Sequence, residues 1–327
     1  MKEIITYFHT DCLLKNNGIN HPERKERLEV VLETIKKIEN IKITIKNPPL
    51  ADLDTVSLVH PKNYINNIFS LIPNDGLKGI ENEPYADTYL CKHSKNAILR
   101  SCGAGIASAD TVMKDRNKRT FCLIRPPGHH AETIRANGFC FVNNVAVTAR
   151  YLQQKYKINK VAIVDFDVHH GNGSQEIFYN DKTVAYGSIH QSPLFPGTGS
   201  EKEIGVGNIF NVPIKSGTNG KEFIGAFNNK ILEKLDLFKP DIILISAGFD
   251  AHQRDPLANI NLNSKDFYEI TKGIVQIAEN HSQGRIISFL EGGYDLIALA
   301  ESSYQHLLAL ANIWMIFIVF SIETNLI

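Results

Sequence analysis

Short runs rich in β-branched and other apolar residues alternate along the chain with longer segments of helical spacing. Eight runs predict strands: IITYF (4–8), IKITI (41–45), TFCLI (120–124), VAIVDF (161–166), TVAYGSI (183–189), NIFNVPI (208–214), DIILISA (241–247) and RIISFL (285–290). Segments 94–113, 141–157, 219–236 and 264–280 have amphipathic spacing and predict helices. This alternation predicts a single α/β domain, in which helices cover both faces of a doubly wound, mostly parallel, eight-stranded sheet.

Composition narrows the choice of function. The chain has 327 residues, of which 43% are hydrophobic, so it can bury a large core. Thirty-five basic residues balance thirty-five acidic ones, and this balance argues against direct binding of nucleic acid. The five cysteines never occur as CxxC, and the N-terminus MKEIITYFHTD has no apolar signal core. We therefore expect reduced thiols and a cytoplasmic protein.

Ionisable residues follow four of the predicted strands. Because ligands bind at the carboxyl ends of the strands in open parallel sheets, these residues are candidates for chemistry. The sets are His129 and His130 after TFCLI; Asp165, Asp167, His169 and His170 at the end of VAIVDF; Asp250 after DIILISA; and Glu291 with Tyr294 after RIISFL.

The stretch VAIVDFDVHHGNG (161–173) places carboxylates and imidazoles at the end of an apolar run. Side chains on an extended strand alternate between its faces. Asp165, Asp167 and His169 are therefore predicted to share one side, with Phe166 and Val168 on the other.

Two neighbouring buried carboxylates are costly unless a positive group neutralises them, and a divalent cation does so most directly. Asp167 and His169 are the first two candidate metal ligands, and Asp250 is the best placed third. A structural alternative remains open for Asp165, whose carboxylate could cap the following turn.

Seven ordered blocks between about residues 4 and 310 resemble the zinc-dependent histone deacetylase superfamily. They are HPERKERL (21–28), RPPGHHAE (125–132), GFCFVNN (138–144), DFDVHHGNG (165–173), FPGTGS (195–200), AGFDAHQRDPL (247–257) and EGGY (291–294). The asparagine at position 172, within HHGNG, resembles the residue found there in the class II branch and in its bacterial deacetylase and acetylpolyamine amidohydrolase relatives. The resemblance implies an arginase/deacetylase-like fold.

The resemblance also implies roles at the reaction centre. Asp167, His169 and Asp250 would bind Zn²⁺, with Fe²⁺ or Co²⁺ as alternatives for this hard ligand set. The catalytic residues implied are His130 as general base, His129 held by Asp165, Asn172 as the neutral partner of His130, and Tyr294 as hydrogen-bond donor to the oxyanion. Asn172 would leave His130 less basic than an aspartate would.

Further residues are implied around this centre. Phe139 and Phe195 would wall a narrow tunnel for an acyl-lysine chain, although core packing is an equally good interpretation from sequence. Gly138, Leu257 at the mouth and Asp87 at the rim would complete the substrate site. Structural K⁺ or Na⁺ ions are implied, one of them near Asp165, Asp167 and Ser188, and Arg27 matches an arginine behind the site.

These features predict a metal-dependent amidohydrolase that removes an acetyl or other acyl group from lysine side chains of proteins or peptides by attack of an activated water. One alternative is a deacetylase of acetylpolyamines or other small amides. Another is a catalytically inactive acyl-lysine-binding or scaffold protein. The motifs GxSxG and GxGxxG are absent, which disfavours a serine hydrolase and a dinucleotide enzyme.

The C-terminus departs from the family pattern. We assign residues 1–311 to the catalytic domain and 312–327 to an apolar tail. The apolar run 307–322 is shorter than the roughly 20 residues that span a bilayer. A homo-oligomer interface or a shifted reading frame is therefore favoured over a membrane contact.

Overall fold

The computed structural model describes residues 1–80 and 87–313. Its main sheet has eight strands in the order β2-β1-β5-β10-β9-β6-β7-β8, and every neighbouring pair is parallel. The strands are β1 (Glu3–Tyr7), β2 (Ile43–Lys46), β5 (Lys118–Cys122), β6 (Val161–Asp165), β7 (Val184–Gln191), β8 (Ile209–Ile214), β9 (Ile242–Ala247) and β10 (Ile286–Leu290). All eight predicted strands are therefore confirmed. A small antiparallel pair, β3 (Lys78–Gly79) with β4 (Tyr89–Leu90), lies outside the sheet.

Helices connect the strands. They are α1 (Asp11–Leu14), α2 (Glu26–Lys37), α3 (Leu53–Val56), α4 (Lys62–Ser70), α5 (Ser94–Lys114), α6 (Asn144–Tyr156), α7 (Asn172–Phe178), α8 (Gly220–Phe227), the π-helix η1 (Asn228–Leu232), α9 (Glu233–Phe238), α10 (Ser264–His281) and α11 (Leu296–Leu310). Predicted helix 141–157 begins later, because the Asn143 side chain caps α6 by accepting from the Ala146 amide. Predicted helix 219–236 is interrupted by η1.

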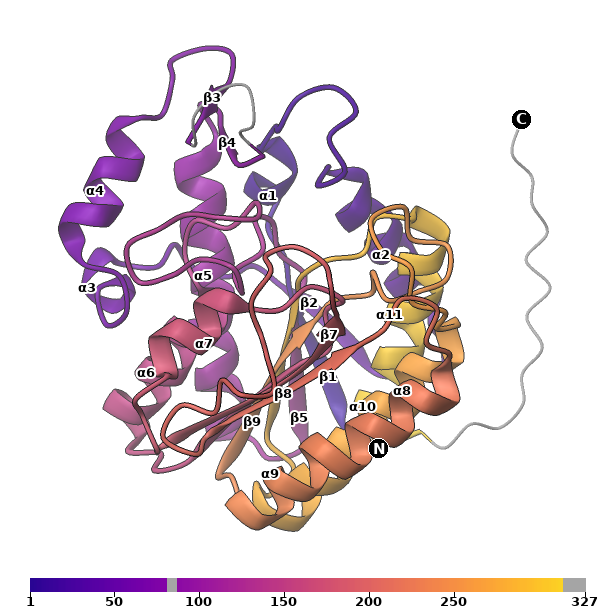
Figure 1. The fold of residues 1–327 in the computed structure, drawn as a ribbon. Helices are drawn as coiled ribbons and strands as arrows, with labels where there is room; N and C mark the ends of the chain where they lie inside the picture. Colours follow the sequence, from indigo (N-terminus) through magenta and orange to yellow (C-terminus); the bar gives the residue numbers. More distant parts are fainter. Residues whose placement is uncertain (81–86, 314–327) are drawn as a thin grey trace.

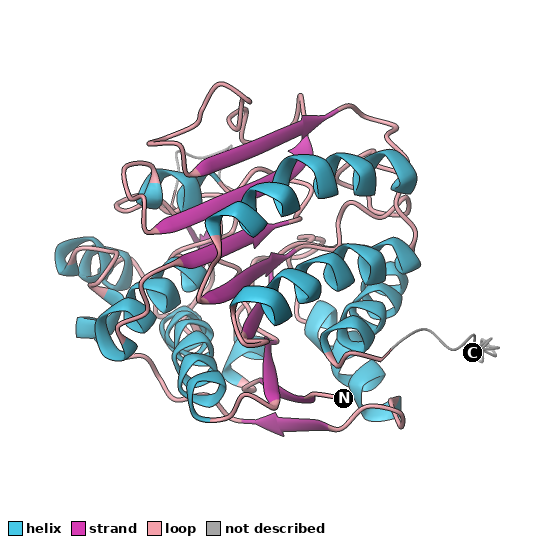
Figure 2. Ribbon diagram, turned by 90° about the horizontal axis from the view of Figure 1, so that it is seen from below, coloured by secondary structure: helices cyan, strands magenta, loops and turns pink. Residues whose placement is uncertain are grey.

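The helices cover both faces of the sheet (Figures 1 and 2). Strand β6 shows how one strand serves both layers. Ala162 and Val164 belong to a core cluster with residues of α2, α8, α10 and α11. Ile163 belongs to a second cluster with residues of α4, α5 and α6. The sheet is thus apolar on both sides, as expected for buried parallel strands.

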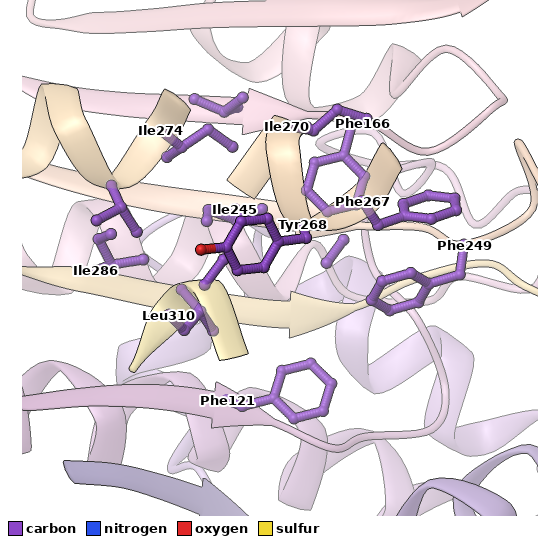
Figure 3. Close-up of a cluster of buried hydrophobic side chains, with 14 of the residues drawn as sticks. Phe121, Phe166, Ile245, Phe249, Phe267, Tyr268, Ile270, Ile274, Ile286 and Leu310 are labelled. Carbon is purple, nitrogen blue, oxygen red and sulfur yellow. The ribbon is translucent and has the colours of Figure 1, made fainter. Parts of the chain in front are cut away.

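Aromatic rings anchor two of the loops that carry ionisable residues. Phe166 follows β6, Phe249 follows β9, and Phe267 lies on α10 (Figure 3). The Phe166 ring lies 6.0 Å from that of Phe249, and the Phe249 ring lies 5.3 Å from that of Phe267. Val168 is buried in the same cluster, which confirms that Phe166 and Val168 point away from the predicted site.

The first part of the C-terminal apolar run belongs to the core. Residues 307–311, at the end of α11, are buried. Residues 314–327, which include most of the predicted apolar tail, lie outside the described residues. Within the described ranges, none of the helices combines the length and apolar composition needed to cross a membrane.

His306 on α11 is fully buried among aromatic rings and pairs with two hydroxyl groups. Its Nδ1 lies 2.7 Å from Thr271 Oγ1, and its Nε2 lies 2.8 Å from Ser288 Oγ. Burial lowers the pKa of His306 from 6.5 to about 3. Its contribution to stability is therefore complete above pH 6.5 and is lost as the pH falls toward 3, because only the unfolded chain binds the proton there.

We expect the variant His306→Gln to weaken the acid dependence of folding stability. One proton taken up only on unfolding contributes about 1.4 kcal/mol per pH unit to the slope of the unfolding free energy. Urea unfolding of both proteins at several values between pH 4 and 6.5 measures that slope. An unchanged slope in the variant would mean that His306 is not the acid-sensitive group.

Candidate active site

A pocket of about 290 Å³ is lined by residues that follow β5, β6, β7, β9 and β10, and by Asp87, which lies just before β4. Its lining residues are Asp87, Pro127, His129, His130, Gly138, Phe139, His169, Leu194, Phe195, Leu257, Gly292 and Tyr294. All five residues predicted to bind substrate are among them, although they come from four separate segments of the chain. The strand ends that the sequence singled out therefore do meet at one place.

Asp167, His169 and Asp250 form a cluster able to hold a metal ion. One ligand atom from each residue lies within 4.8 Å of the others. Both carboxylates are fully buried, and His169 Nδ1 lies 3.1 Å from Asp167 Oδ1 and 3.2 Å from Asp250 Oδ2. Burial alone would lower the pKa of His169, but its hydrogen bonds with these carboxylates and their charges raise the pKa to about 10. The two carboxylates thus favour a positive charge at this point.

The surroundings of the cluster fit a divalent cation. Its ligand set of two carboxylates and one imidazole is suited to zinc and to harder divalent metals, and leaves coordination positions for other ligands. Gly292 donates its amide to Asp167 Oδ2 at 2.7 Å. A Cβ at position 292 would lie 2.0 Å from Asp250 Oδ2 and 2.6 Å from Asp167 Oδ2. Only glycine therefore leaves the two carboxylates room to approach each other here.

The two adjacent histidines have different partners. His129 Nδ1 donates to Asp165 Oδ2 at 3.0 Å, and His130 Nδ1 donates to Asn172 Oδ1 at 2.9 Å. Burial alone would lower the pKa of His129, but Asp165 and Asp167 raise it to about 10. Burial, followed by the charges of His129 and His169, holds the pKa of His130 well below its usual range. The surroundings of His129 thus favour its cationic form, whereas those of His130 favour its neutral form.

Asp165 is both a partner of His129 and part of the following turn. Its Oδ1 accepts from the Asp167 amide at 3.2 Å, and its Oδ2 also accepts from the Tyr186 hydroxyl at 3.0 Å. Asp165 therefore makes the contacts that both interpretations require, and its catalytic role stays a prediction. Ser188 lies opposite Asp165 on the neighbouring strand β7, and its hydroxyl pairs with His190. The monovalent-cation site near Asp165, Asp167 and Ser188 stays a prediction.

Tyr294 lines the pocket, and contacts with Arg27 and Asp255 hold the loop that carries it. Arg27 donates from Nε to the Gly293 carbonyl oxygen at 2.7 Å, and its guanidinium lies 5.0 Å from the Tyr294 ring centroid. The Tyr294 amide donates to Asp255 Oδ2 at 2.7 Å. The Arg27 side chain is buried and pairs with Glu23. A chain of buried charges thus fixes the backbone that presents the tyrosine.

Phe139 and Phe195 line the pocket and do not join the core clusters. The Phe195 ring lies 5.0 Å from the His130 ring, and the Phe139 ring lies 6.2 Å from the Tyr294 ring. Phe139 has a φ of 70°, unusual for a bulky residue, and its amide donates to Thr88 Oγ1. Gly138 leaves space for the His130 ring, which a Cβ at this position would approach to 2.4 Å. This geometry favours the tunnel interpretation over core packing.

Two carboxylates have larger roles than the sequence indicated. Glu291, which the sequence marked only as an ionisable residue after a strand, accepts from the Gly128 amide at 2.7 Å and so ties the tyrosine loop to the histidine pair. Burial raises its pKa to about 7. Asp255, which received no role from sequence, holds both the Tyr294 and the Leu257 amides. The only sequence signal for Asp255 was the turn-forming pair Asp-Pro.

The fold and the pocket together define an α/β protein with a cluster of metal-ligand residues, a histidine pair and a tyrosine at the carboxyl edge of a parallel sheet. A family model for the histone deacetylase domain matches residues 21–310. The chain therefore belongs to the histone deacetylase family and is a deacetylase-type hydrolase.

Similar proteins support this assignment. A probable deacetylase of Archaeoglobus fulgidus is 34% identical over 296 residues, which cover 88% of this chain and 80% of the relative. The type-2 histone deacetylase 2 of Dictyostelium discoideum is 34% identical over 89% of this chain, which spans only 20% of that longer protein. The crystal structure of the HDA15 HD domain matches with a TM-score of 0.86 and 30% identity, covering 95% of this chain and 88% of the other.

We expect the variant Asp250→Asn to lose most of its bound divalent metal and its activity together. The substitution removes one of two anionic ligands and leaves a weaker site. Metal content after dialysis, measured by plasma mass spectrometry, tests this expectation. Asp255→Asn is the matched control, because Asp255 is buried in the same loop but lies outside the ligand cluster. Wild-type metal content in Asp250→Asn would remove Asp250 from the ligand set.

Proposed function

We propose that the protein hydrolyses the amide bond between an acetyl or other acyl group and a lysine side chain of a peptide or protein. The observation that carries this proposal is the convergence of the metal-ligand cluster, the neutral His130 and the Tyr294 side chain on one aromatic-walled pocket. Amide hydrolysis at neutral pH needs an activated water, a polarised carbonyl and an acid for the leaving nitrogen, and this set can supply all three.

We propose the following roles for the residues of the chain in catalysis. Asp167, His169 and Asp250 would hold a divalent metal, which would supply Lewis-acid chemistry and lower the pKa of a water molecule. His130 donates a hydrogen bond from Nδ1 to Asn172 Oδ1, which keeps Nε2 free to take a proton and to return it to the departing amine. Tyr294 would donate its hydroxyl proton in a hydrogen bond to the oxygen that gains charge.

We propose zinc as the metal, with Fe²⁺ or Co²⁺ as alternatives, because the ligand set contains no thiolate. K⁺ or Na⁺ as a structural ion near Asp165, Asp167 and Ser188 is part of the same proposal. We also place the protein in the cytoplasm, since all five cysteines are unpaired and buried. We also propose that the protein forms a homo-oligomer.

An acyl-lysine chain suits the pocket better than an acetylpolyamine. Phe139 and Phe195 offer aromatic rings to an alkyl chain. Leu257 lines the same pocket, and the mouth position that the resemblance implies for it would hold no carboxylate to attract a second ammonium group. An inactive acyl-lysine-binding or scaffold protein is less well supported, because the ligand cluster, both histidines and Tyr294 all line or border the same pocket.

We expect the variant Tyr294→Phe to lower kcat far more than it raises KM. The phenol hydrogen bond strengthens as the carbonyl oxygen gains charge, so its loss acts mainly on the transition state. The expected fall in kcat is about a hundred- to thousandfold, on the order of 3 kcal/mol. Steady-state kinetics on an acetyl-lysine peptide, with metal content as the control, measures the effect. A wild-type kcat would show that Tyr294 is not the oxyanion donor.

We expect a higher kcat/KM for acetyl-lysine peptides than for acetylated polyamines. The variant Leu257→Glu should raise kcat/KM for the polyamine by about fivefold, because a carboxylate at the mouth attracts its free ammonium groups. Leu257→Gln is the matched neutral control and should leave the ratio of the two substrates nearly unchanged. A wild-type preference for the polyamine would support the alternative function.

A further inference from the structure

Glu132 lies two residues after the histidine pair and contacts the partner of His130. Its Oε1 accepts from Asn172 Nδ2 at 2.7 Å. The other end of the same amide, Asn172 Oδ1, accepts from His130 Nδ1 at 2.9 Å. Asn172 thus bridges a carboxylate and an imidazole.

The two ends of an amide are not equivalent, so its orientation matters. If the Asn172 amide were reversed, its oxygen would face the Glu132 carboxylate, and it would also face the His130 carbonyl oxygen, which lies 3.4 Å from Nδ2. Both contacts would place acceptor against acceptor. The NH₂ group would then face His130 Nδ1, and the imidazole proton would have to move to Nε2. That is the nitrogen required to accept a proton from the substrate side.

The backbone around Glu132 is well fixed. The Glu132 amide donates to the Arg135 carbonyl oxygen at 2.9 Å. Next to it, Thr133 donates to Glu176 Oε2 from its amide at 2.9 Å and from its hydroxyl at 2.8 Å. Asn172 and Glu176 both lie on α7, so this helix carries the amide and also pins the loop that bears Glu132.

We propose that Glu132 is a positioning residue that fixes the orientation of the Asn172 amide and thereby keeps the His130 proton on Nδ1 and its lone pair on Nε2. This inference rests on the proposed function, because it gives the His130 base its correct tautomer. An aspartate at position 172 would need no such partner, since its two carboxylate oxygens are equivalent. An asparagine needs a neighbour with an oxygen that accepts from its NH₂ group, and Glu132 is that neighbour.

Three variants test the role of Glu132 in turnover. Glu132→Ala should lower kcat on an acetyl-lysine peptide about tenfold at unchanged KM and metal content, as expected for loss of an outer-shell orienting group. Glu132→Gln keeps an acceptor oxygen and should stay within about threefold of wild type. Thr133→Val removes one hydrogen bond from the same loop and should leave kcat unchanged. A wild-type kcat in Glu132→Ala, or an equal loss in Glu132→Gln, would overturn the proposal.

A double-mutant cycle separates orientation from general loosening of the loop. In an Asn172→Asp background, Glu132→Ala should leave kcat unchanged or raise it, because the symmetric carboxylate needs no orientation and two facing carboxylates repel each other. If Glu132→Ala lowered kcat about tenfold in this background as well, Glu132 would act by another route.

The tautomer of His130 can also be observed without substrate. In the metal-loaded protein with nitrogen-labelled histidine, long-range proton–nitrogen correlation spectra distinguish a proton on Nδ1 from one on Nε2. The wild type and Glu132→Gln should show His130 with its proton on Nδ1, and Glu132→Ala should show a mixture. An unchanged tautomer in Glu132→Ala would overturn the inference. This result stands even if the wild type hydrolyses no acyl-lysine substrate, so the two failures can be told apart.

Discussion

Four carboxylates lie fully buried at the carboxyl ends of three neighbouring strands, and the rest of the site follows from how their charge is balanced. They are Asp165, Asp167, Asp250 and Glu291. Backbone amides, hydroxyl groups and the imidazole of His129 compensate part of this charge. A divalent cation would compensate it at the three converging ligand atoms.

Packing of apolar side chains holds these buried carboxylates in place. Asp165 and Asp167 point toward the histidine pair, whereas the intervening Phe166 is buried against Phe249 and Phe267. Each anchoring ring therefore fixes the direction of its charged neighbours in the chain. Behind the tyrosine loop, Arg27 and its partner Glu23 do the same for the backbone. The chemistry-bearing side chains are thus set by a rigid interior and not by flexible loops.

The sequence predicted the sheet and the cluster of candidate metal ligands because both depend on local signals. Apolar runs mark the strands, and the rule that ligands bind at strand ends identified Asp167, His169 and Asp250. Contacts between distant segments leave no such signal. The Glu132–Asn172 hydrogen bond, the support of the Tyr294 amide by Asp255 and the break of helix 219–236 at η1 depend on tertiary packing. The sequence also could not decide whether Phe139 and Phe195 pack in the core or line a tunnel, because that depends on the pocket formed by distant segments.

The central claim is that this centre hydrolyses an acyl-lysine amide with water and requires a metal. The most direct test is turnover of an acetyl-lysine peptide in oxygen-18 water, with the protein metal-loaded, chelator-stripped and reloaded. The account predicts deacetylated peptide and acetate in equal amounts, one labelled oxygen in each acetate, loss of turnover on chelation and recovery on reloading. Undiminished turnover in metal-stripped protein, or acetate without the label, would contradict it.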